Sequence, residues 1–339
     1  MGILPSSRKI LRRVHILPSL LTLGNFSCGF FSIVFCLNAL FFTARAQMLE
    51  AGIEAPQPTV AASGGEYHDL LDMTGSPSPA DIHRASLTGS NARAAYMLTC
   101  ACVIVFVGML FDMLDGKVAR HMRTDSAFGK ELDSLSDIVT FGIAPSLIVT
   151  TQWIAVMPVA ASWWGQVMIF GAVYAACAAL RLARYNIDVG IGDKNIFSGL
   201  PSPAAAGCIV TAVLLAEGNY AFVGEVCEWF SALSGGVVPA TQVKSRLLAI
   251  FMLFVGMMMV TTIPFPHLAN RYLVGRKSFA VLVVLVLLIA LLWHEPRIFS
   301  FLMFNGYMAA GLAAAVRKYA RGRWAKTDGG GQWDGDNPP

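Results

Sequence analysis

The stretch from Phe111 to Asp137, FDMLDGKVARHMRTDSAFGKELDSLSD, places four aspartates at the boundary between two apolar segments. They are Asp112, Asp115, Asp133 and Asp137. Residues three and four positions apart lie on one face of an α-helix. We therefore expect the first pair to share a face of one helix and the second pair to share a face of the next. If the two helices pack side by side, the four carboxylates converge.

Converging carboxylates repel one another at a membrane boundary, so positive charge should lie among them. Divalent cations that take oxygen ligands are natural candidates. An alternative is that the acids are solvated or pair with basic residues near the helix ends, because Lys117, Arg120, Arg123 and Lys130 are close in sequence. The alternative explains one aspartate more easily than four at this spacing.

The spacing D-x2-D-G-x2-A-R-x8-G-x3-D-x3-D resembles the signature of the CDP-alcohol phosphotransferase family at every position. The resemblance implies an all-α, polytopic helical-bundle fold and two divalent metal ions, Mg²⁺ or Mn²⁺. It implies Asp112, Asp115 and Asp133 as metal ligands. Asp137 would be the general base and could also touch a metal ion.

The resemblance also implies a nucleotide site around the first pair of aspartates. Small side chains would let the CDP moiety approach the helix, and a guanidinium offers a fixed fork of donors for phosphate. By this resemblance the CDP-binding residues are Asp115, Gly116, Ala119, Arg120 and Gly129.

Two later stretches resemble the branch of the family that uses serine as acceptor. They are RLARYN (Arg181 to Asn186) and FSGLPSPAAAG (Phe197 to Gly207). This implies CDP-diacylglycerol and L-serine as substrates, with Arg181 and Arg184 binding the lipid phosphate or the serine carboxylate. Ionisable groups at membrane depth usually face a protein interior or a cavity.

The N-terminal stretch LPSLLTLGNFSCGF (Leu17 to Phe30) resembles the same branch but has Ser19 where asparagine is expected. Thr22 and Asn25 remain candidate polar contacts for the nucleotide, because an amide inside a membrane helix normally needs a partner.

The signature leaves the acceptor alcohol open. Choline, inositol or glycerol phosphate would use the same chemistry, and two arginines suit a polyol phosphate as well as an amino acid. A cation transporter is a rival from another class, with the aspartates as an ion path. A transporter's acids are expected near the bilayer midplane, beside broken helices or internal repeats.

The composition is that of a membrane protein. Of 339 residues, 55% are hydrophobic and 14% are charged, against about 25% charged in a typical soluble domain. The small excess of basic residues does not indicate nucleic-acid binding. No two of the seven cysteines form a CxxC pair, which argues against a zinc site or a disulfide framework.

Hydropathy divides the chain into six parts and predicts about eight membrane-spanning helices. The helix that follows the aspartates should bend near Pro145. Residues 43–92 read as a polar, non-cytoplasmic loop with little fixed structure. The parts are a basic tail (1–15), a first span (16–42), the loop (43–92), a catalytic core (93–217), C-terminal spans (218–316) and a basic, then disordered, tail (317–339).

The basic residues predict the orientation in the membrane. With eight spans both ends lie on one side, and 19 of the 25 Lys and Arg residues fall in the loops and tails of that side. Cytoplasmic loops carry such an excess, so both termini and the aspartate motif should be cytoplasmic. The family resemblance implies a bacterial inner-membrane protein, in contact with membrane lipid, and a homodimer.

Overall fold

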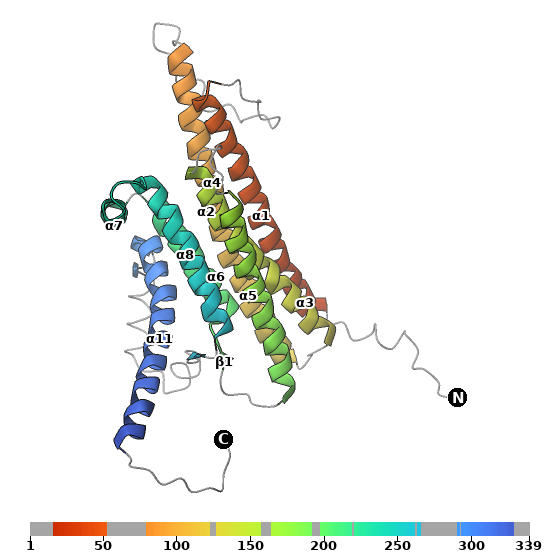
Figure 1. The fold of residues 1–339 in the computed structure, drawn as a ribbon. Helices are drawn as coiled ribbons and strands as arrows, with labels where there is room; N and C mark the ends of the chain where they lie inside the picture. Colours follow the sequence, from red (N-terminus) through yellow and green to blue (C-terminus); the bar gives the residue numbers. More distant parts are fainter. Residues whose placement is uncertain are drawn as a thin grey trace, which may run out of the picture.

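The computed structural model describes residues 16–52, 79–122, 127–156, 164–191, 197–218, 220–261, 263–265, 290–291 and 293–328. These residues form long helices and one very short antiparallel pairing, which confirms the polytopic helical class (Figure 1). The elements are α1 (Ile16–Glu50), α2 (Pro79–Met122), α3 (Ala127–Asp137), η3 (Ile138–Ile143), α4 (Ala144–Val156), α5 (Trp164–Ile191), β1 (Phe197–Ser198), α6 (Ser202–Glu217), α7 (Ala221–Leu233), α8 (Ala240–Val260), β2 (Pro264–Phe265) and α11 (Pro296–Asp328).

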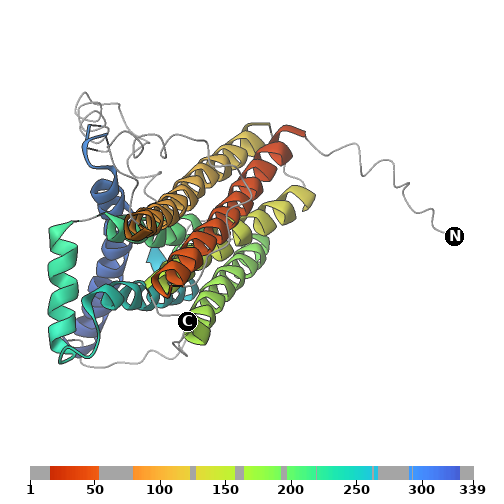
Figure 2. The same ribbon diagram turned by 90° about the horizontal axis from the view of Figure 1, so that it is seen from above.

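Six helices in the described residues are long and apolar enough to cross a membrane, or seven if the bent pair of α6 and α7 counts as one span. These two helices meet at 94°, and α7 lies at the outer edge of the bundle, next to the start of α8 (Figures 1 and 2). The predicted C-terminal spans (218–316) include residues 266–289, which lie outside the described residues. The predicted number of eight therefore stays a prediction.

The prediction of a loop over residues 43–92 is wrong at both of its ends. The first helix continues to Glu50, and the second begins at Pro79. Residues 43–50, TARAQMLE, include good helix formers such as Ala, Arg, Gln, Met and Leu, so helix propensity extends the first span beyond its apolar part. The basic segment after residue 316 is likewise helical, because α11 runs to Asp328 and not only to the end of the apolar run.

The irregularity predicted near Pro145 takes the form of a π-helical turn, η3, inside one continuous span. In an α-helix the carbonyl of Phe141 would accept from the N–H of residue 145, which proline lacks. The buried hydroxyl of Tyr174, from α5, donates to this carbonyl at 3.0 Å. The turn begins directly after Asp137, and π-helical turns often occur at functional sites.

The core lies between α4 and α6, and most residues of both helices are buried. The first half of α6, SPAAAGC, has small side chains that let neighbouring helices approach closely. A Cβ at Gly207 would overlap the ring of Phe304 in α11. Close packing against small residues replaces the hydrophobic effect as the force that assembles helices in lipid.

The stretch before α6 is fixed against the end of α8. Phe197 pairs with Phe265 across β1 and β2, and the N–H of Leu200 donates to the carbonyl of Met258 at 3.0 Å. Gly199 has φ +89°, and a side chain there would collide with the carbonyl of Met259. These contacts satisfy carbonyls that the last turn of α8 leaves without helical partners. They also set where α6 begins, with Pro201 at its N-cap.

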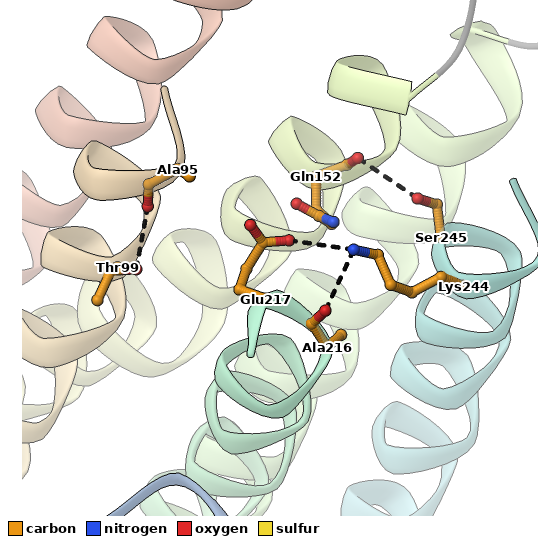
Figure 3. A network of polar contacts seen from close by, with 7 residues as sticks. All are labelled: Ala95, Thr99, Gln152, Ala216, Glu217, Lys244 and Ser245. Atoms are coloured by element: carbon orange, nitrogen blue, oxygen red, sulfur yellow. Dashed lines mark hydrogen bonds and ion pairs between the residues drawn. The ribbon is translucent and has the colours of Figure 1, made fainter. Parts of the chain in front are cut away.

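A second polar cluster joins the end of α6 to the start of α8 (Figure 3), and the start of α8 lies at the end of the bundle away from α3 (Figure 1). Lys244 of α8 donates to Glu217 Oε1 at 3.4 Å and to the carbonyl of Ala216 at 3.1 Å. The hydroxyl of Ser245 donates to the carbonyl of Gln152 at 3.4 Å. A cavity of about 190 Å³ beside this ion pair is lined by residues of α1, α2, α4, α6 and α8.

Candidate active site

Three of the four aspartates converge at one end of the bundle. Carboxylate oxygens of Asp112, Asp133 and Asp137 all lie within 4.8 Å of one another. Asp112 comes from the last part of α2, and the other two come from α3, one helical turn apart. The predicted packing of the two aspartate-bearing helices therefore brings carboxylates together from both.

Asp115 does not belong to this group of three, although it shares a helix face with Asp112. It is only 5% exposed, and its Oδ2 has no hydrogen-bond partner in the described part of the chain. The hydroxyl of Thr22 and the backbone amide of Gly116 interact with its carboxylate. Asp115 is thus held beside the cluster, on the side of α1.

The donor set fits divalent metal ions. Three carboxylates from two elements surround one small volume, and hard oxygen ligands are those that Mg²⁺ and Mn²⁺ prefer. Asp133 Oδ1 is buried without a hydrogen-bond partner in the described residues, as is Asp115 Oδ2. A buried, unpaired carboxylate oxygen is costly, and a bound cation removes that cost.

Arg181 adds one positive charge next to the cluster. It lies near the C-terminal end of α5, half-buried, and interacts electrostatically with Asp112 and Asp137. Its guanidinium donates to the hydroxyl of Ser202, which is fully buried at the first turn of α6. The helix N-terminus, the guanidinium and the carboxylates thus meet at one place. Arg184, one turn further along α5, is exposed.

Hydrogen bonds join α1 to the second aspartate-bearing helix. The amide Nδ2 of Asn25 donates to Asp137 Oδ1 at 3.1 Å, and the hydroxyl of Ser136 donates to the carbonyl of Thr22 at 3.1 Å. The hydroxyl of Thr22 donates to the carbonyl of Pro18 at 3.0 Å. Both predicted nucleotide contacts in α1 therefore lie beside the aspartates and have partners within the protein.

Other predicted nucleotide-binding positions are placed only by their backbone. Gly116 follows Asp115 in α2, and Gly129 lies in the first turn of α3. Ala119 and Arg120 belong to α2, but their side chains lie outside the described part of the structure. These assignments stay predictions.

Sequence reasoning missed Ser202, Thr140 and two glycines. Thr140 continues the i, i+4, i+7 spacing of Asp133 and Asp137, which could have placed it on the same face. Its hydroxyl donates to the carbonyl of Asn25 at 2.9 Å. The two glycines, Gly29 and Gly108, follow no periodic pattern in the sequence. They matter because a Cβ at either position would collide with Thr140 where the helices cross.

Comparison with known proteins agrees with this geometry. The CDP-alcohol phosphatidyltransferase family model matches residues 85–316. A Helicobacter pylori protein named CDP-diacylglycerol–serine O-phosphatidyltransferase is 34% identical over 174 residues, which are 51% of this chain and 63% of the relative. A Mycobacterium leprae protein of the same name is 28% identical over 228 residues, 62% of this chain and 69% of that protein.

An archaetidylserine synthase of Methanothermobacter thermautotrophicus is 33% identical over 178 residues, 52% of this chain and 67% of that protein. The match spans less than two thirds of the Helicobacter relative's length. The family model, by contrast, covers more than half of this chain and includes the whole aspartate motif. The chain therefore belongs to the CDP-alcohol phosphatidyltransferase family.

Proposed function

We propose that this protein transfers the phosphatidyl group of CDP-diacylglycerol to the hydroxyl of L-serine, giving phosphatidylserine and CMP. The observation that carries the reaction class is the convergence of Asp112, Asp133 and Asp137 within the family's motif. The choice of serine is supported by the names of the bacterial relatives and of the archaeal one.

The reaction requires one bond to form and one to break at the lipid-linked phosphorus. The serine oxygen bonds to this phosphorus as the bond from phosphorus to the bridging oxygen of CMP breaks. Asp137 accepts the hydroxyl proton, and CMP leaves with the electron pair of the broken bond. A general base must lie within hydrogen-bond reach of the proton that it takes, and Asp137 is the buried member of the three.

The three clustered carboxylates would hold the metal, Mg²⁺ or Mn²⁺, with Asp115 completing the site on the nucleotide side. When bound, the ions neutralise charge on the phosphoryl oxygens. Asp115, Gly116, Ala119, Arg120 and Gly129 would hold the CDP moiety beside them.

Arg181 would bind the lipid phosphate or the serine carboxylate, since its half-buried guanidinium offers fixed donors for either anion. Its bond to Ser202 holds it at the start of α6, close to the carboxylates. Arg184, exposed at the end of α5, would bind the same anions from the rim of the site or interact with lipid headgroups.

We propose further that the aspartate end of the bundle faces the cytoplasm of a bacterial inner membrane, as the distribution of basic residues indicates. Soluble serine and CMP would then exchange directly with the cytoplasm. A homodimer is proposed from the family resemblance.

The test is metal-dependent release of CMP from CDP-diacylglycerol by the purified protein in detergent. Serine, choline, inositol and glycerol 3-phosphate are supplied separately, and Asp137→Asn is the control. Serine-dependent release that the variant lacks supports the proposal. Release with another alcohol keeps the reaction class and replaces the acceptor. If none of the four gives release, while Mn²⁺ crosses proteoliposomes containing the protein, the enzyme assignment fails in favour of transport.

A further inference from the structure

Asn25 is a completely buried residue of α1, and its side-chain amide contacts the active site. Its exposed fraction is 0%, and its Nδ2 donates to Asp137 Oδ1 at 3.1 Å. The two residues are 112 positions apart in the chain, so the bond exists only because α1 packs on the α3–η3 helix.

The backbone on both sides of this bond is also fixed. The hydroxyl of Thr140 donates to the carbonyl of Asn25 at 2.9 Å, and that of Ser136 donates to the carbonyl of Thr22 at 3.1 Å. The two donors flank Asp137 in sequence, one before it and one a turn after it. The carboxylate therefore lies between two bonds that hold α1 in register with its own helix.

Two glycines bring the backbones close enough for these bonds. A Cβ at Gly29 would lie 2.5 Å from Thr140 Oγ1, and a Cβ at Gly108 would lie 2.6 Å from the Thr140 methyl group and 3.1 Å from Asn25 Oδ1. The backbones of α1, α2 and η3 therefore approach one another closely around Asn25 and Thr140.

The orientation of the amide follows from its neighbours. Asn25 Oδ1 has no hydrogen-bond partner in the described residues, so its Nδ2 group provides the favourable contact with the carboxylate. The reverse orientation would place two oxygens against each other. A hydrogen bond from the amide to one carboxylate oxygen restrains rotation of the carboxyl group and leaves the second oxygen for other partners.

We propose that Asn25 is a positioning residue for Asp137. It holds Oδ1 of that carboxylate so that Oδ2 is presented to the metal cluster and to the acceptor hydroxyl. This inference rests on the proposed function, and it differs from the contact with nucleotide that the sequence suggests for Asn25. A positioning residue acts on the chemical step, whereas a nucleotide contact acts on the binding of CDP-diacylglycerol.

The distinguishing variant is Asn25→Leu, which keeps a similar shape and removes the donor. Outer-shell partners of metal-binding carboxylates typically contribute 10–100-fold in metal affinity or activity. We expect kcat to fall by about 10–100-fold and Mn²⁺ affinity in the substrate-free protein to fall by about tenfold. The KM for CDP-diacylglycerol should stay within about threefold of its original value, because no nucleotide contact is lost.

The matched control is Asn38→Leu in the same helix. Asn38 donates to the carbonyl of Val34, one turn earlier, at 3.0 Å and is exposed on the outer face of α1. This variant removes the same amide from the same helix without touching the site. We expect its kcat, KM and Mn²⁺ affinity to match those of the parent protein.

A second pair of variants covers the case in which Asn25→Leu fails to fold. Thr140→Val keeps the shape and removes the donor to the Asn25 carbonyl, whereas Thr140→Ser retains the hydroxyl. Loss of one neutral hydrogen bond should lower kcat by about fivefold in the valine variant. The serine variant should keep the activity of the parent.

The measurements are steady-state kinetics with saturating serine and Mn²⁺ binding followed by electron paramagnetic resonance. A raised KM with unchanged kcat in Asn25→Leu would overturn the inference and restore the nucleotide contact. Unchanged kcat and Mn²⁺ affinity would overturn it as well, as would equal activity of the two Thr140 variants. If the parent protein releases no CMP, the proposed function fails, and the Mn²⁺ measurement alone decides the role of Asn25.

Discussion

Gly108 lies where α2 crosses both α1 and the π-helical turn that follows Asp137, and replacing it with alanine tests this packing directly. The added Cβ would lie 2.6 Å from the methyl group of Thr140, 3.1 Å from Asn25 Oδ1 and 3.3 Å from Cys28 Cβ. Atoms of two different elements therefore surround it. Movement away from one neighbour does not relieve the contact with the others.

The size of the effect follows from these distances. Carbon atoms in contact prefer about 3.5–4.0 Å, so α2 must move by about 1 Å. Overpacking of this kind costs about 1–3 kcal/mol, offset by a gain in helix propensity of up to about 1 kcal/mol. With the full offset, the net loss of stability is at most about 2 kcal/mol. A displacement of about 1 Å next to the carboxylates can lower the catalytic rate by about 100-fold.

The assay pairs CMP release with thermal denaturation in detergent. Gly89→Ala, in the same helix, is the control, because a Cβ at Gly89 meets nothing within 4 Å among the described residues. It should keep full activity and gain about 0.5–1 kcal/mol from the lower flexibility of the unfolded chain. A Gly108→Ala protein with the parent's melting temperature and kcat would refute the close packing at this crossing.

Three further outcomes follow from contacts in the bundle. Lys244→Met should lower the free energy of unfolding by about 1–3 kcal/mol, because it leaves the half-buried Glu217 carboxylate without its ion-pair partner. The double variant with Met at both positions should recover most of this loss. Chemical denaturation measures both effects. Tyr174→Phe should cost about 1–3 kcal/mol by leaving a buried carbonyl without a donor, measured as a lower melting temperature. Arg181→Lys should reduce kcat/KM at least tenfold, because a point charge cannot replace the fixed fork beside the carboxylates, whereas Arg184→Lys at an exposed position should change it less than threefold. Equal effects of the two arginine variants would contradict the different places that the structure gives them.

The hydropathy of the sequence predicts much of the fold. The apolar runs of the described spans are long enough to cross a bilayer, and lipid leaves the backbone few choices other than helix. The helix ends were predicted less well. Polar continuations such as residues 43–50 are helical because of side-chain propensity, which a hydropathy pattern does not report.

The sequence by itself determined the family, the helical membrane class and the aspartates that form the site, because a helix places residues three and four apart on one face and the motif fixes that spacing. It could not determine which carboxylates meet. Asp112 joins Asp133 and Asp137, while its neighbour Asp115 stays outside that group, because the crossing of α2 with α3 sets the distances.

Only the tertiary structure showed that Asn25 donates to Asp137 and that Gly108 permits the contact. The hydrogen bond joins residues 112 positions apart, and no local pattern in the chain encodes either relation. They arise when small residues let three helices pack closely enough for buried polar groups to satisfy one another in a medium that offers no water.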